Sequence, residues 1–225
     1  AVTRFAPSPT GWLHIGGVRT ALYSWLFARK NNGKFFLRID DTDTTRSTKE
    51  FKDSIISALN HLALNHDGEI LYQSSRFDHY IDKIEELLKK DLAYYDKVEV
   101  NEKTKETNLN IQYENRLNKD GHVIRFKNQR DQAVNIKDSV HGEISFDPKT
   151  FFDVVILRSN GVPTYNLTSV VDDIDLGITH LIRGDDHLSN LPVQINLFRS
   201  FEADVPSFSH LPMIVNSQGK PFSKR

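Results

Sequence analysis

The stretch Arg4-Phe-Ala-Pro-Ser-Pro-Thr-Gly-Trp-Leu-His-Ile-Gly-Gly17 decides how this chain begins to fold. An apolar run from Val2 to Ala6 favours a short buried strand, and Pro7 and Pro9 end that strand because proline has no N–H to donate to a sheet. Glycines follow, and an apolar pattern with helical spacing begins directly after Gly17. The stretch therefore predicts a strand, a glycine-bearing turn and a helix, in that order.

This order of elements is typical of a phosphate-binding site. Glycines let a ligand approach the backbone, and a helix N-terminus offers free N–H groups and partial positive charge. Neither G-x-G-x-x-G nor G-x-x-x-x-G-K-S/T occurs in the stretch, which excludes the dinucleotide and P-loop fingerprints. The stretch indicates nucleotide binding of another kind.

Strand and helix patterns alternate at both ends of the chain, with a different pattern between them. A capping box, Ser47-Thr-Lys-Glu50, should start a helix. Apolar residues at helical spacing predict helices at 51–62, 77–90 and 188–198. Short apolar runs predict strands at 34–39, 123–126, 134–136, 140–146, 152–157 and 178–182.

These patterns predict an α/β protein. Residues 1–94 and 161–225 should form one nucleotide-binding domain around a parallel sheet, because alternating strands and helices are typical of such sheets. Residues 95–160 are polar at first and then rich in short strands, so they should form a smaller α+β insertion domain between the two halves.

Composition narrows the class of protein. A hydrophobic share of 38% in 225 residues is enough to fill a core, and a net charge of −1 excludes a global basic field, so any RNA contact must be local. The absence of cysteine excludes disulfides and thiolate metal sites. Without a membrane-spanning run or a signal-peptide pattern, a cytoplasmic protein with no membrane contact is expected. The chain stops directly after a glycine turn, which suggests a fragment of a longer protein.

Charged residues at predicted strand ends are candidates for binding a small charged molecule. Arg4 lies in the first strand, Arg183 closes the strand near 178–182, and Asp40-Asp-Thr-Asp43 follows the strand at 34–39. A guanidinium group binds a carboxylate through two parallel hydrogen bonds, so two arginines fit a dicarboxylic amino acid. Surface ion pairs for the arginines, and a turn with a helix cap for the aspartates, remain open as alternatives.

The opening stretch is similar to the first signature of class I aminoacyl-tRNA synthetases. His14-Ile-Gly-Gly17 resembles the His-Ile-Gly-His motif in the form typical of glutamyl-tRNA synthetases, and the flanking Arg4 to Gly11 resembles the same family. Pro221-Phe-Ser-Lys-Arg225 is similar to the second signature, Lys-Met-Ser-Lys-Ser, with Lys224 at the second lysine. The resemblance spans the chain and implies a Rossmann-like class I synthetase domain.

The resemblance also implies roles for individual residues. ATP would be bound by His14, Gly16, Gly17 and Lys224, of which His14 and Lys224 would be catalytic. Glutamate would be bound by Arg4, Ala6, Ser8, Asp40, Tyr165 and Arg183. Asp40 and Asp185 stand where the family usually has glutamate, and Pro221 stands at the first lysine. On residue type alone, His14 could instead be a core histidine and Lys224 a solvated one. Asp172 and Asp173 would lie near the adenosine or act as structural supports.

The implied activity is ATP-dependent ligation of L-glutamate to tRNA(Glu) through a glutamyl-adenylate, with Mg²⁺ assisting. The insertion domain would hold the acceptor end of the tRNA, although its basic residues also fit a solvated surface. Zinc held by cysteines is not expected. The protein is expected to be a monomer. Two alternatives remain: a glutamyl-queuosine tRNA(Asp) ligase, which modifies an anticodon base, and a non-catalytic relative that binds an amino acid or RNA.

Overall fold

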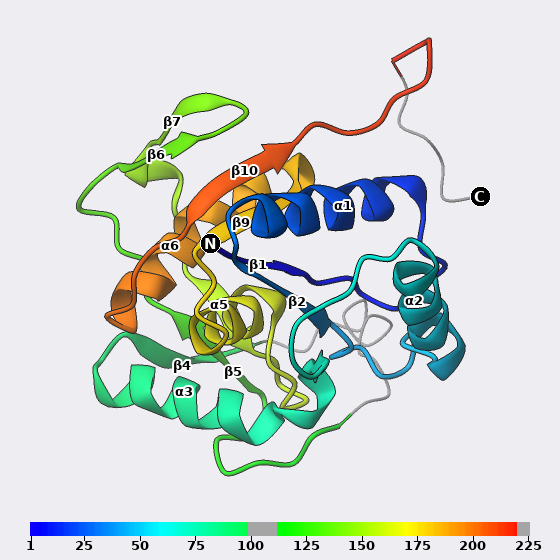
Figure 1. Cartoon of the computed structure of the whole chain (residues 1–225). Coiled ribbons are helices and arrows are strands. Elements are labelled where there is room, and N and C mark those ends of the chain that lie inside the picture. Colours follow the sequence, from blue (N-terminus) through cyan, green and yellow to red (C-terminus); the bar gives the residue numbers. More distant parts are fainter. Residues whose placement is uncertain (99–111, 220–225) are drawn as a thin grey trace.

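The first strand, helix and strand form a parallel unit in the computed structural model, which describes residues 1–98 and 112–219 (Figure 1). They are β1 (Val2–Phe5), α1 (Ile15–Lys30) and β2 (Lys34–Ile39), with β2 parallel to β1. The order predicted from the opening stretch is confirmed. Gly33 is required after α1, because a Cβ there would lie 1.8 Å from the carbonyl oxygen of Ala1.

The remaining elements follow in chain order. The helices are α2 (Lys49–His61), α3 (Phe77–Lys89), α5 (Tyr165–Asp175) and α6 (Leu191–Ser200), with short 3₁₀ turns at Gln73–Ser75, Pro148–Thr150 and Asp185–Asn190. The strands are β3 (Leu71–Tyr72), β4 (Ala93–Lys97), β5 (His122–Phe126), β6 (Val134–Asp138), β7 (Gly142–Phe146), β8 (Val154–Leu157), β9 (His180–Gly184) and β10 (Ser207–Leu211).

The described strands form three ladders. One has the order β1-β2-β3 and is parallel, and another has the order β7-β6-β10-β9, in which β10 runs parallel to both β6 and β9. The edges of these two ladders meet where the amide of Thr179 donates to the carbonyl oxygen of Val2 at 3.0 Å. The third ladder, β4-β5-β8, is antiparallel. The predicted α/β class with a parallel sheet is confirmed.

Helices α1 and α5 cover opposite faces of β1 (Figure 1). Successive side chains of a strand point to opposite faces. Accordingly, the Thr3 hydroxyl donates to the carbonyl oxygen of Ser24 in α1 at 2.8 Å, whereas the Arg4 guanidinium reaches Asp173 in α5. The helix α5 therefore lies on the face of the sheet that carries the predicted arginine.

Several sequence-based boundaries differ from the structure. The helix cap is Thr48, whose hydroxyl accepts from the amide of Phe51, so the capping box predicted at Ser47 was one residue early. The strand predicted at 140–146 begins at Gly142, because Asp138 accepts the amide of Val140 and holds it in a turn. Helix α5 and strand β10 were not predicted at all.

The strands inside the predicted insertion divide between two ladders. Strands β5 and β8 belong to the antiparallel ladder, whereas β6 lies beside β10, a strand of the second half of the chain. The domain boundaries at 95 and 160 stay a prediction.

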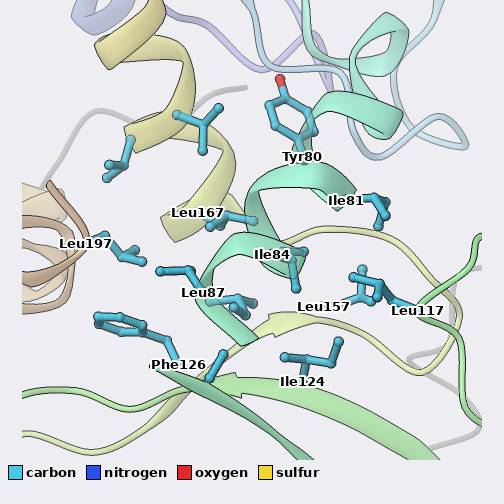
Figure 2. Packing of buried hydrophobic residues seen from close by; sticks show 14 of the residues in the cluster. Tyr80, Ile81, Ile84, Leu87, Leu117, Ile124, Phe126, Leu157, Leu167 and Leu197 are labelled. Atoms are coloured by element: carbon cyan, nitrogen blue, oxygen red, sulfur yellow. The ribbon is translucent and has the colours of Figure 1, made fainter. Parts of the chain in front are cut away.

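One large hydrophobic cluster joins α3, α5 and α6 to the antiparallel ladder (Figure 2). Tyr80, Ile84 and Leu87 of α3 pack between the antiparallel ladder and the helices α5 and α6. All three are fully buried, and burying side chains of this size contributes about 1.5–3 kcal/mol each. The Tyr80 ring belongs to this cluster, while its hydroxyl donates to Asp172 in α5 at 2.9 Å. The cluster thereby fixes the helix that carries the acidic groups of the site.

Candidate active site

The carboxyl ends of β1, β2 and β9 carry the predicted glutamate-binding residues. The loop after β1 touches the end of β2, because the amide of Asp40 donates to the carbonyl oxygen of Pro7 at 2.9 Å. Strand β9 follows Thr179, which bonds to the start of β1. Ligands of parallel α/β sheets bind at this edge of the strands.

A buried charge network fills the space between β1, β2 and α5. Arg4 donates its Nε to Asp173 Oδ1 at 3.0 Å and its Nη2 to Oδ2 at 3.3 Å. Arg38 donates to the two carboxylate oxygens of Asp40 at 2.6 and 3.1 Å, and its Nη1 donates to Asp173 Oδ1 at 2.8 Å. All four side chains are buried. The two guanidinium groups therefore share the carboxylate of Asp173, and Arg38 is also paired with Asp40.

The acids of this network respond differently to burial. Burial raises the pKa of Asp40 to about 6, even though Arg38 favours its charged form. Burial acts the same way on Asp173, but the charges of Arg4 and Arg38 outweigh it and lower the pKa of Asp173. Burial alone would lower the pKa of Arg38, yet the surrounding carboxylates raise it above the ordinary value. Asp173 is thus the fixed negative charge of the network.

Arg183 in β9 is equally buried but has neutral partners. Its Nε donates to Nε2 of His210 at 3.0 Å, its Nη1 to the Tyr165 hydroxyl at 3.4 Å, and its Nη2 to the carbonyl oxygen of His187 at 3.4 Å. Among the described residues no carboxylate forms an ion pair with it. Burial, and then repulsion from Arg4, lowers the pKa of Arg183. A buried cation without a counter-ion is costly, so an anion bound at this group would stabilise it.

The N-terminus of α1 opens beside these strands. His14 is the exposed N-cap residue, and the first turn of the helix contains no acidic side chain that would occupy the free N–H groups. Gly16 lies under the imidazole, since a Cβ there would approach the His14 ring to 3.1 Å. Gly17 packs near Phe5 at the end of β1. A phosphate could therefore reach both the helix N-terminus and the His14 ring.

Other predicted site residues are placed as follows. Ala6 is half-buried and Ser8 exposed in the loop after β1, and Tyr165 is half-buried at the start of α5, where its hydroxyl contacts Arg183. The structure brings these residues and Asp40 to the same edge of the sheet. Lys224 and Pro221 lie outside the described residues.

The alternatives for Asp172 and Asp173 are decided in favour of structural support. Asp172 accepts from Gln73 at 2.7 Å, from the Tyr80 hydroxyl at 2.9 Å and from Arg76 at 2.9 Å. Both aspartates are buried against protein donors. They hold the sheet, α3 and α5 together and orient the arginines.

Sequence reasoning missed several residues of the site. Arg38, His187, His210 and Asp138 were not selected as site residues. Arg38 lies in β2, and Asp40 lies two residues further on, directly after the strand. Residues two apart in an extended chain point to the same face, and that spacing could have revealed the pair. Asp138 and His210 come from strands 72 residues apart, and no local pattern indicates that they meet.

Four basic residues of the predicted insertion are paired with acids. Arg116 bonds to Glu85, and the pairs Arg125–Asp96, Lys127–Asp91 and Arg130–Asp153 are also formed. These pairs agree with a solvated surface for those four residues. A role in tRNA binding stays a prediction, and Lys103 and Lys105 lie outside the described residues.

The described residues do not fit a dedicated Mg²⁺ site. No three acidic or histidine side chains in residues 1–98 and 112–219 are arranged to hold a metal ion. Mg²⁺ commonly binds through substrate phosphates with few protein ligands. We therefore assign the expected ion no step of the reaction.

Fold and site together define a parallel α/β domain in which the buried Arg183 and the N-terminus of α1 lie at the carboxyl ends of the strands, where such domains bind their ligands. Residues 1–225 match the family described as tRNA synthetases class I (E and Q), catalytic domain. The chain belongs to this family of class I synthetase catalytic domains.

Curated relatives of the chain are glutamate–tRNA ligases. The chain is 48% identical to that of Francisella tularensis subsp. novicida over 99% of its own length and 51% of the relative. It is 46% identical to that of Neisseria meningitidis serogroup B, covering 99% of the chain and 52% of the relative. The chain thus spans about half the length of these relatives.

Solved structures agree with the fold. A glutamate tRNA ligase from Elizabethkingia meningosepticum, solved in complex with its amino acid, superposes with a TM-score of 0.86 at 34% identity, covering all of this chain and 52% of that one. Methionyl-tRNA synthetase from Mycobacterium tuberculosis superposes with a TM-score of 0.64 at 9% identity over 94% of this chain and 56% of that one, a likeness of fold alone.

Proposed function

We propose that the protein ligates L-glutamate to tRNA(Glu) in two steps that use ATP. The observation that carries this proposal is Arg183, a buried guanidinium whose partners are all neutral. A carboxylate of the substrate would supply the missing charge and two parallel hydrogen bonds. Glutamine, which lacks the side-chain charge, would leave Arg183 without a counter-ion if that end of the substrate binds there. The pocket therefore favours glutamate.

In the first step, the α-carboxylate of glutamate attacks the α-phosphorus of ATP, and pyrophosphate leaves. The attacking oxygen carries no proton, so this step depends on alignment and charge neutralisation more than on a general base. The N-terminus of α1, with His14, Gly16 and Gly17, would hold the phosphates. Lys224 would neutralise the charge of the leaving group.

The other glutamate-binding residues would position the substrate. Arg4, already paired with Asp173, would present the outer side of its guanidinium, and Ala6, Ser8 and Tyr165 would line the pocket. Asp40 would bind the ammonium group, directly or through a water, although its carboxylate also bonds to Arg38. In the second step, the terminal ribose hydroxyl of tRNA takes the glutamyl group and AMP leaves.

The wider setting is also part of this proposal. The insertion at 95–160 would hold the acceptor end of tRNA(Glu), and the protein would act as a cytoplasmic monomer. Within the part of the chain that the structure describes, every helix is too short or too polar to cross a membrane.

Pyrophosphate exchange in the complete protein tests the proposal. With glutamate, ATP and tRNA(Glu) present, the wild type should exchange, and Arg183→Ala should lower the exchange roughly 100-fold because a charged contact is lost. Arg199→Ala, which removes an exposed arginine in the last turn of α6, is the matched control and should exchange normally. Exchange absent from the wild type would point to the non-catalytic alternative. Glutamyl transfer only to tRNA(Asp) carrying queuosine would favour the other ligase.

A further inference from the structure

A second set of buried polar side chains, joined by hydrogen bonds, reaches Arg183 from behind the proposed pocket. Nε of Arg183 donates to Nε2 of His210 at 3.0 Å, and Nδ1 of the same imidazole lies 2.7 Å from Oδ2 of Asp138. His210 is fully buried in β10, and Asp138 at the end of β6 is only 2% exposed. No motif discussed above includes either residue.

The chemistry of the donors fixes the tautomer of His210. A guanidinium can only donate, so Nε2 of the imidazole must be an acceptor and the proton must be on Nδ1, which donates to Asp138. His210 is therefore neutral. The pKa of His210 agrees with this, since burial above all lowers it to about 4.

Asp138 is itself held firmly. Its carboxylate accepts from the amides of Val140 at 2.9 Å, His141 at 3.0 Å and His210 at 3.1 Å. Burial would raise the pKa of Asp138, but the hydrogen bond from the His210 ring, followed by those from the amides of His141 and Val140, outweighs it and lowers the pKa. The carboxylate is thus a fixed anchor for the imidazole.

The two arginines of the pocket differ in the charge of their hydrogen-bond partners. Arg4 meets the carboxylate of Asp173, which offsets its charge. Arg183 meets an imidazole, which satisfies the Nε–H group and leaves the positive charge available. Its Nη contacts are long, at 3.4 Å each, so a ligand carboxylate can replace them at little cost.

We propose that His210, oriented by Asp138, is a positioning residue that fixes the guanidinium of Arg183 for a substrate carboxylate without neutralising it. This inference rests on the proposed function. It assigns β6 and β10, through Asp138 and His210, a part in recognising the amino acid.

Two variants separate the two hydrogen bonds of His210. In His210→Gln, the amide oxygen stands close to the place of Nε2 and can still accept from Arg183. In His210→Asn, the shorter amide can still bond to Asp138 but no longer reaches Arg183. Both replace the ring with a neutral amide, so the acceptor for Arg183 is the main difference between them.

The test measures the KM values for glutamate and for ATP in pyrophosphate exchange by the complete protein, with tRNA(Glu) present. His210→Asn should raise the KM for glutamate about 10-fold and leave the KM for ATP unchanged, because only the orientation of Arg183 is lost. His210→Gln should stay within about 3-fold of the wild type. Thermal unfolding of each variant reports on stability separately.

Three outcomes decide the inference. It is overturned if the Asn and Gln variants bind glutamate equally, or if both KM values rise together with a fall in melting temperature. Should His210→Asn not fold, Asp138→Asn takes its place and must raise the KM for glutamate alone. The proposed function fails separately, when the wild type does not exchange with glutamate or when Arg183→Ala exchanges normally.

Discussion

Oδ1 of Asp173 accepts from two buried arginines at once, from Arg4 at 3.0 Å and from Arg38 at 2.8 Å. One carboxylate of α5 therefore joins β1 to β2 across the face of the sheet. Arg38 in turn pairs with Asp40 at 2.6 Å and with Asp172 at 3.7 Å, so Asp173 is linked through Arg38 to the other buried carboxylates next to the proposed pocket.

Replacing Asp173 tests this organising role. Asp173→Asn keeps the shape but leaves two buried guanidinium groups without their shared charge, so the free energy of unfolding should fall by about 3 kcal/mol. Asp175→Asn, two residues away on the same helix but one third exposed, is the control and should cost about 1 kcal/mol or less. Urea unfolding measures both. Equal losses for the two variants would show that Asp173 has no special role.

Replacing Gly16 tests the phosphate site, because the change should weaken function without lowering stability. In Gly16→Ala the new Cβ would press on the His14 ring, so the KM for ATP should rise several-fold. Stability should stay the same or increase by up to about 1 kcal/mol, because alanine favours the helix. Gly11→Ala, whose Cβ would have no neighbour within 4 Å, should change neither. Unchanged ATP kinetics in Gly16→Ala would argue against phosphate binding at this turn.

Acid should destabilise the protein through His210. Its pKa is about 4 when folded and 6.5 as the ordinary value, so the unfolded state binds the proton first as the pH falls. Stability supplied by the neutral imidazole is complete above pH 6.5 and is lost progressively down to pH 4, by as much as about 3 kcal/mol.

Asp40 acts in the opposite direction, because its folded pKa is raised to about 6. Its contribution favours the folded state at low pH and is lost as the pH rises through 6. Comparing the wild type with His210→Gln at pH 4.5 and pH 7 cancels the contribution of Asp40, because that residue is the same in both proteins. The wild type should lose more stability on acidification than the variant; parallel losses would contradict the assignment.

The sequence predicted those parts of the fold whose signals are local. β1, α1, β2 and α3 follow from proline and glycine positions or from apolar spacing, and the structure has all four. Helix α5 is an exception, because it was missed although Leu167, Val170, Val171 and Ile174 recur at helical spacing. Strand β10 was missed because it is short and carries Ser207, Ser209 and His210.

The same distinction applies to the site. Arg4, Asp40 and Arg183 could be selected because each lies at a predicted strand end, and a resemblance supplied Ala6, Ser8 and Tyr165. Which arginine is neutralised, however, depends on contacts across more than 160 residues, between Arg4 and Asp173. Only the folded chain shows that Asp173 takes Arg4 and that Arg183 is left with an imidazole.

The most direct test of the account compares L-glutamate with L-glutamine as substrates for aminoacylation of tRNA(Glu), in the complete wild-type protein and in Arg183→Gln. If Arg183 binds an anionic group of the substrate, the kcat/KM of the wild type should be at least about 100-fold higher for glutamate than for glutamine. The variant should lose most of that preference. A wild type that uses both amino acids equally, or a variant that keeps the full preference, would contradict the claim that this uncompensated charge selects the substrate.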